Sequence, residues 1–196
     1  MKLTLDPNCI IDLEENRPAA AHLRELMAMH SAGVLHLAVV GISASENLPG
    51  GGSAPTFAAF QEKAARVGLA DAEILKPMGI WGVTYWDWGL WGDNAMEELA
   101  RQIHAVLFPD SDYDYVEYCA QRGTVVNENS IDPRWRNQLC DVLALWSHVY
   151  YRRDLFVTRD TNFLASAKRQ ALSALGVGTM CSPSKAVATV RRDPAP

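Results

Sequence analysis

The chain has 196 residues, of which 48% are hydrophobic and 21% are charged. With a mean hydropathy of -0.08, this composition predicts a soluble globular protein and excludes collagen-like, coiled-coil and disordered chains. No apolar run approaches the roughly 20 residues of a membrane span, so we expect no membrane anchor and no membrane partner. The four cysteines lack the spacing of a zinc site. Because we also expect no signal peptide, we interpret them as reduced thiols of a cytoplasmic protein.

The charge is divided unevenly along the chain. Residues 1–132 carry 8 Lys and Arg against 19 Asp and Glu, a net charge of -11, whereas residues 133–196 carry 10 against 4, a net charge of +6. Carboxylates gathered in the acidic part could bind a cation, and the basic part could follow a phosphate backbone. An ordinary solvated surface explains the same distribution, so charge alone does not choose between these interpretations.

Hydrophobic periodicity predicts strands that alternate with helices. Apolar runs predict strands at 2–5, 34–40, 155–158 and 177–181. Helical spacing of apolar residues predicts helices within 23–30, 57–67, 96–107, 113–120, 133–151 and 163–175. The helix from Pro133 has a strong start, because Asp132 is an N-cap that accepts free amide protons and proline has none to lose. Residues 191–196 are expected to form a frayed terminus.

This alternation predicts the fold class. Strands that alternate with helices form a parallel sheet that is covered on both faces, so we expect an α/β protein with a three-layer α/β/α architecture and a central parallel sheet. The sequence contains no internal repeat and no linker. Residues 1–196 are therefore predicted to form a single domain.

Carboxylates follow the predicted strands. Ligands of open parallel sheets bind beyond the carboxyl ends of the strands, which makes Asp6, Glu46 and Asp160 candidate functional residues. Asp141 lies at the edge of the apolar face of the long helix, where an isolated carboxylate is costly to bury. Four converging carboxylates would repel one another, and a hard divalent cation such as Mg²⁺ or Mn²⁺ would relieve that repulsion.

Three of these carboxylates also have a structural explanation. Asp6 could form a turn with the proline that follows it, and Asp160 could cap a helix. A glutamate after a loop serine, as at Glu46, is common. Only Asp141 has no obvious structural partner in the sequence, so the combination of the four is more informative than any one of them.

The combination resembles the PIN-domain ribonucleases, and in particular the bacterial toxin-type members. In that family a first strand ends in aspartate, a glutamate follows the second strand, an aspartate lies in a later helix, and a strand closes in Thr-x-Asp-x-x-Phe. The corresponding segments here are Leu3–Leu13, Ile42–Leu48, Cys140–Leu145 and Leu155–Phe163. The resemblance covers residues 1–48 and 132–182, and we interpret the region at about 50–131 as a helical, Trp-rich insertion.

The resemblance implies a site and a reaction. It implies an acidic cluster that would hold Mg²⁺ or Mn²⁺, formed by Asp6, Glu46, Asp141 and Asp160. It implies hydrogen-bonding residues beside that cluster, namely Asn8, Thr158 and Asn162. The implied reaction is hydrolysis of RNA phosphodiester bonds, in which the cation activates a water molecule and stabilises charge on the phosphate oxygens.

Basic residues near these segments are candidates for holding the RNA backbone. They are Arg152, Arg153, Arg159 and Lys168. Arg152 and Arg153 also complement the negative end of the long helix, which explains them without RNA.

Four tryptophans and Tyr85 fall within residues 81–91. Aromatic rings on such a glycine-rich segment could stack unpaired bases, anchor a protein interface, or form a small core of the inserted region. Residues 77–100 contain no Lys or Arg, which disfavours contact with a phosphate backbone there.

From the sequence we expect a cytoplasmic, metal-dependent endoribonuclease. Bacterial relatives are often toxins that are held by an antitoxin, so the resemblance implies an antitoxin or another protein as partner, and a homodimer is a further possibility. A rival interpretation is a catalytically inactive PIN-like module that binds RNA or protein. A phosphatase-like hydrolase with Asp6 as nucleophile is disfavoured, because Asn8 stands where that chemistry needs a second carboxylate.

Overall fold

The computed structural model describes residues 1–44, 56–85, 88–127 and 130–193. Its centre is a five-stranded, all-parallel sheet in the order β3-β2-β1-β4-β5. The strands are β1 (Lys2–Leu5), β2 (His36–Val40), β3 (Glu73–Leu75), β4 (Leu155–Val157) and β5 (Thr179–Cys181). Strands β1 and β4 are neighbours, with Leu3 paired to Leu155, although almost the whole chain separates them.

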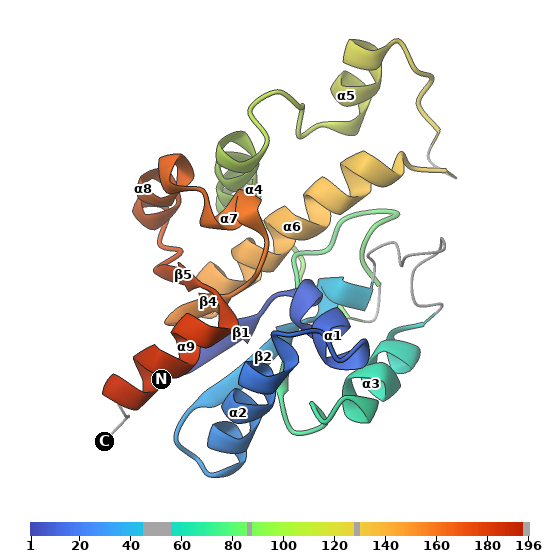
Figure 1. The fold of residues 1–196 in the computed structure, drawn as a ribbon. Coiled ribbons are helices and arrows are strands. Elements are labelled where there is room, and N and C mark those ends of the chain that lie inside the picture. Colours follow the sequence, from blue (N-terminus) through green and yellow to red (C-terminus); the bar gives the residue numbers. More distant parts are fainter. Residues whose placement is uncertain (45–55, 86–87, 128–129, 194–196) are drawn as a thin grey trace.

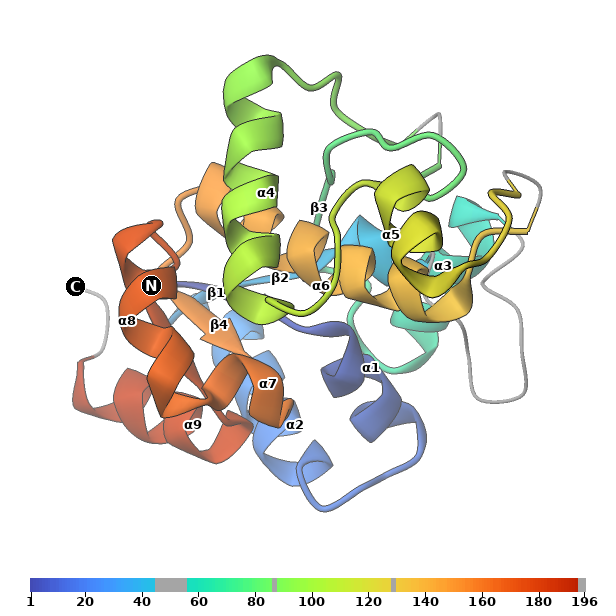
Figure 2. The same cartoon turned by 90° about the horizontal axis from the view of Figure 1, so that it is seen from above.

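Helices cover both faces of the sheet, as Figures 1 and 2 show, which confirms the predicted three-layer α/β/α architecture. One face carries α1 (Pro7–Glu14), α2 (Ala20–Ser31), α3 (Phe57–Arg66) and α9 (Pro183–Arg192). The other carries α4 (Asn94–Leu107), α5 (Tyr115–Arg122), α6 (Pro133–Tyr150), α7 (Thr161–Leu164) and α8 (Ser166–Ala174). A short 3-10 helix, η1 (Gly41–Ala44), follows β2.

The core lies on both faces of the sheet because successive strand residues point to opposite sides. In β2, Leu37 and Val39 belong to the cluster under α1, α2, α3 and α9, whereas Ala38 and Val40 belong to the cluster under α4 and α6. A strand that is apolar on both faces reads as a continuous hydrophobic run, and this explains why the sequence around β2 shows no alternation.

Helix α6 is held against the sheet and against α4. Asp132 caps its first turn by accepting hydrogen bonds from the backbone N–H groups of the next turn, as the sequence predicts. Near its end, Trp146 donates its indole N–H to the carbonyl of Met96 in α4 at 3.0 Å. His148 is fully buried and contacts the hydroxyl of Thr4 in β1 at 2.9 Å. Burial lowers the pKa of His148 to about 4, so its imidazole is neutral at physiological pH.

Both chain ends differ from the expectation. Helix α1 begins directly after β1, where the sequence had suggested only a turn, because Pro7 is favoured at the first helical position. Helix α9 extends to Arg192 and buries Ala186, Val187 and Val190, so residues 191 and 192 close a helix instead of forming a frayed tail.

The region interpreted as an insertion contributes to the sheet itself. Residues 57–66 form α3, which buries Phe57 and Phe60 in the core, and residues 73–75 form the edge strand β3. The sequence did not reveal β3 because its three residues, Glu-Ile-Leu, are too short for a period to be visible. The predicted insertion therefore includes one strand of the sheet and one helix that covers it. Its described residues after 75 belong to neither β3 nor α3.

Two further expectations concern membranes and thiols. Among the described residues, no helix combines the length and the apolar character that a bilayer span requires. All four cysteines are buried free thiols.

Arg153 is buried at the amino-terminal edge of the sheet. Its Nη2 donates to the carbonyls of Leu3 and His36 at 2.7 and 2.9 Å, and its Nη1 pairs with Glu73 at 2.7 Å. It thereby joins β1, β2 and β3, and its side chain is 2% exposed. The expectation that Arg153 contacts RNA is therefore wrong, and the exposed Arg152 lies beside it at the same edge, away from the carboxyl ends of the strands.

We predict that Arg153→Ala lowers the free energy of unfolding by roughly 2–3 kcal/mol, because two buried carbonyls would lose a charged donor. Arg152→Ala is the matched control and should change it by less than about 0.5 kcal/mol, as exposed positions do. Urea unfolding of the two variants tests this. Equal destabilisation by both would show that the buried hydrogen bonds of Arg153 do not hold the strands together.

Candidate functional site

The candidate site lies at the carboxyl ends of β1 and β4. From β1 the chain builds the sheet outward through β2 to β3, and from β4 it builds outward in the other direction to β5. The sheet order therefore reverses between β1 and β4, which is where open α/β sheets bind ligands. Asp6 directly follows β1, donating its backbone N–H to the carbonyl of Val157, and Asp160 follows β4.

Asp6 is buried and faces Thr158. It occupies the N-cap position of α1, yet its side chain makes no capping hydrogen bond. Instead its Oδ2 accepts a hydrogen bond of 2.6 Å from the Thr158 hydroxyl. The residue is 2% exposed, and burial, reinforced by the neighbouring charge of Asp160, raises the pKa of Asp6 to about 7 in spite of the Thr158 hydrogen bond.

Thr158 joins the residues of the site. Its hydroxyl donates to Asp6 and accepts from the backbone N–H of Asp160 at 2.9 Å and from the Asn8 side-chain amide at 3.3 Å. A hydroxyl has one proton and two lone pairs, so these three bonds use its full capacity and fix its orientation. The structure thus brings three other predicted site residues, Asp6, Asn8 and Asp160, into contact with the buried Thr158.

Asp160 begins the short helix that follows β4. Its Oδ1 accepts the backbone N–H of Asn162 at 2.7 Å, which is the capping role that the sequence left open for it. The side-chain oxygen of Asn162 in turn accepts a hydrogen bond from Lys168, which also donates to the carbonyl of Leu107 at 2.6 Å. Asn162 and Lys168 therefore lie beside the site, and Lys168 ties it to the end of α4.

Sequence reasoning missed the role of Asp12. Its side chain is fully buried and forms an ion pair with Arg159, and Arg17 approaches it at 3.7 Å. The backbone N–H of Arg159 also donates to the Asn8 side chain at 3.4 Å. A signal was present, because Asn8 and Asp12 are four residues apart and so share one face of a helix. Arg159, expected to bind RNA, here neutralises a buried carboxylate and holds the segment that carries Asp160.

Asp141 lies on the side of α6 that faces the sheet. The C-terminal end of α6 lies at the amino-terminal edge of the sheet, because Arg153, which follows the helix, bonds Leu3 there. Helix α6 therefore runs antiparallel to β1. His148 contacts β1, and Asp141 stands seven residues before it, which is about two helical turns on the same face of α6. Asp141 is therefore about 10 Å nearer to the carboxyl ends of the strands than His148 is. Half-buried Asp141 is thus on the sheet-facing side of α6 and lies toward the carboxyl ends of the strands, the end of the sheet at which Asp6 stands.

Glu46 lies outside the described residues, so its place relative to the other carboxylates is not part of the structure. Within the described ranges, no group of three or more His, Cys, Asp or Glu side chains is close enough together to hold a metal ion. Asp6 and Asp160 both bond the Thr158 hydroxyl, Asp6 through its side chain and Asp160 through its backbone N–H.

Comparison with protein families, with curated proteins and with solved structures finds no significant match to this chain. The functional assignment therefore depends on the chain's own residues and on the site at β1 and β4.

The raised pKa of Asp6 predicts a pH-dependent stability. Between about pH 4, near the ordinary value of 3.8, and pH 7 the folded protein holds a proton on Asp6 that the unfolded chain releases. The stabilisation from this proton is complete below that window and is lost as the pH rises through it. Asp6→Asn removes the titration, so the variant should match the wild type near pH 4 and exceed it in stability above pH 7.

Urea unfolding across this pH range in the presence of a chelator measures the difference. Asp110→Asn is the matched control, because Asp110 is exposed. Parallel pH profiles for the wild type and Asp6→Asn would contradict a raised pKa at Asp6.

Proposed function

We propose that the protein is a cytoplasmic, metal-dependent endoribonuclease that uses Mg²⁺ or Mn²⁺ to hydrolyse RNA phosphodiester bonds. The observation that carries this proposal is Asp6, a buried carboxylate with a pKa of about 7 beside Asp160, at the point where the strand order reverses. A buried carboxylate whose pKa is raised by burial and by a neighbouring charge is a candidate for a functional residue.

The chemistry of the described residues fits a hard divalent cation. Asp6 and Asp160 supply carboxylate oxygens, the ligands that Mg²⁺ and Mn²⁺ prefer. Among the described residues, Thr158 bonds Oδ2 of Asp6, and the backbone N–H of Asn162 bonds Oδ1 of Asp160. The PIN resemblance implies that Asp141 of α6 and Glu46 complete the ligand set.

When bound, such a cation would supply a water nucleophile and stabilise charge on the phosphate oxygens. The chain's own residues prepare the site for it. Thr158 and Asn8 orient Asp6, and the Arg159–Asp12 ion pair holds the loop that carries Asp160.

Thr158→Val should therefore reduce activity by about 10–100-fold, as the loss of a residue that orients a ligand does.

RNA is the substrate that the family resemblance implies, and two basic residues near the site support a polyanion. The Arg159 side chain is 38% exposed although it pairs with Asp12, and Lys168 lies next to Asn162. The proposal includes an antitoxin, another protein partner or a homodimer only because the family resemblance suggests them.

The experiment is RNA cleavage by the purified protein. Single-stranded and structured RNAs are incubated with Mg²⁺, with Mn²⁺ and with chelator. We expect metal-dependent cleavage that falls below detection in Asp6→Asn and Asp160→Asn, because each substitution removes a carboxylate oxygen and its charge from the site. Asp110→Asn, an exposed aspartate far from β1 and β4 in sequence, should cleave as the wild type does.

Two results would contradict the proposal. Cleavage that survives in both variants would place the activity elsewhere or in a contaminant. If the wild type is inert with every RNA and Mg²⁺ or Mn²⁺ does not raise its melting temperature, the chain is the inactive PIN-like module that the sequence left as the rival.

A further inference from the structure

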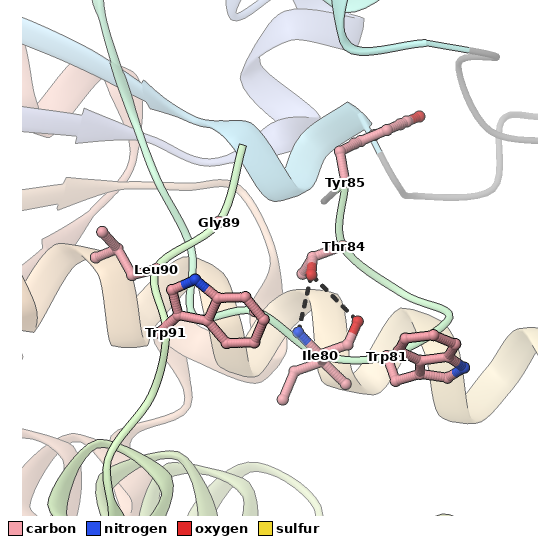
Figure 3. A pocket seen from close by; sticks show the side chains of 8 residues that line it. Ile80, Trp81, Thr84, Tyr85, Gly89, Leu90 and Trp91 are labelled. Atoms are coloured by element: carbon pink, nitrogen blue, oxygen red, sulfur yellow. Dashed lines mark hydrogen bonds between the residues drawn. The ribbon is translucent and has the colours of Figure 1, made fainter. Parts of the chain in front are cut away.

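A pocket lies in the Trp-rich segment, away from the candidate site. Its lining includes Ile80, Trp81, Thr84, Tyr85, Leu90 and Trp91, and its volume is about 60 Å³. That volume holds a few water molecules or the end of one side chain. Figure 3 shows Trp81 and Trp91 extending from the two arms of the segment with Ile80 between them, while the ring of Tyr85 points away.

Of the three tryptophans of this segment that the structure describes, one stacks on the core and two are largely exposed. Trp88 stacks on Phe57 of α3 at 4.3 Å between ring centroids and so anchors the segment to the core. Trp81 and Trp91 are 71% and 86% exposed. Two large exposed indole rings beside one apolar pocket are unusual for a surface and are typical of a contact that a partner covers.

The backbone around the pocket is already paired. The N–H of Gly79 donates to the carbonyl of Leu90 at 2.8 Å, and the N–H of Leu90 donates to the carbonyl of Pro77 at 2.9 Å. The Thr84 hydroxyl bonds both the N–H and the carbonyl of Ile80. These groups are not offered to an added strand, so a partner would be held through the aromatic side chains.

The segment that lines the pocket is itself acidic and favours a cationic partner, although Arg136 of α6 donates to the carbonyl of Val83 beside it at 3.4 Å. Residues 77–100 carry four Asp and Glu and no Lys or Arg. Asp93 and Glu98 lie at the exposed start of α4, directly after Trp91, while Glu97 is paired with Arg101. Indole faces attract cations, and the carboxylates add to this attraction while opposing a phosphate backbone.

We propose that this pocket docks a basic, proline-containing segment of a partner protein, with an Arg or Lys side chain against Trp81 or Trp91. Proline-rich segments are extended before they bind and dock on aromatic surfaces through side chains, which suits a pocket whose backbone is already paired. The proposal does not depend on the ribonuclease site, because it concerns different residues and a different ligand.

The test is calorimetric titration of the full-length protein with a capped peptide of four Arg-Pro repeats. We expect saturable binding that weakens with added salt. Trp81→Ala and Trp91→Ala should each weaken it by about 10-fold or more, since exposed tryptophans of this kind dominate interfaces. Asp93→Asn should weaken it by about 3-fold, because asparagine keeps the helix cap of α4 but loses the charge.

Matched controls separate docking from damage to the fold. Val125→Ala alters an apolar side chain that is 89% exposed elsewhere, and it should bind as the wild type does. The tryptophan variants should keep the wild-type melting temperature, because both rings lie largely outside the core.

Three outcomes would overturn the proposal. They are no saturable binding of the Arg-Pro peptide, equal binding by the wild type and both tryptophan variants, and equal binding of a peptide of four Glu-Pro repeats. Binding of an eight-residue oligouridylate that depends on Trp81 and Trp91, without tryptophan-dependent binding of the Arg-Pro peptide, would assign the pocket to nucleobases instead.

Discussion

The pairing of β1 with β4 is the constraint on which the site depends. These strands lie at opposite ends of the sequence, and their parallel register brings Asp6 and Asp160 to the same edge of the sheet. Both strands are buried, so the carboxylate of Asp6 is removed from water at the point where a second negative charge stands beside it. Burying a charge in this way is costly unless something binds it.

Two buried carboxylates at α1, Asp12 within the helix and Asp6 at its N-cap, differ in how the fold treats their charge. Asp12 is fully buried and is neutralised by Arg159 and approached by Arg17, so its charge serves the fold. Asp6 has a hydroxyl partner in Thr158 but no ion pair among the described residues, and its pKa rises to about 7. The fold therefore supplies a cationic partner for Asp12, whereas the partner of the Asp6 side chain among the described residues is the neutral hydroxyl of Thr158.

The sequence predicted the features that depend on local pattern. Alternating strands and helices gave the architecture, and Asp132 before Pro133 gave the start of α6. The position of Asp6 and Asp160 after their strands also followed from local pattern. The resemblance to PIN domains added the roles of Asn8, Thr158 and Asn162, and the structure groups these residues around Asp6 and Asp160 without testing their chemistry.

What the sequence did not predict depends on tertiary contacts. The edge strand β3 is too short to show a period, and it exists because it pairs with β2. The sequence places Arg153 among the candidate RNA-binding residues, because no local pattern indicates that its side chain is buried and joins three strands. The division of the tryptophans into the stacked Trp88 and the exposed Trp81 and Trp91 likewise follows from the position of α3.

The most direct test of the account is the titration of the Asp6 carboxyl carbon by NMR, assigned with the Asp6→Asn variant. Without divalent cations we expect a midpoint near pH 7, and Mg²⁺ should move that midpoint to lower pH because a bound cation favours the ionised carboxylate. A midpoint near the ordinary value of 3.8, or one near 7 that Mg²⁺ leaves unchanged, would contradict the claim that Asp6 is a buried carboxylate held for a cation.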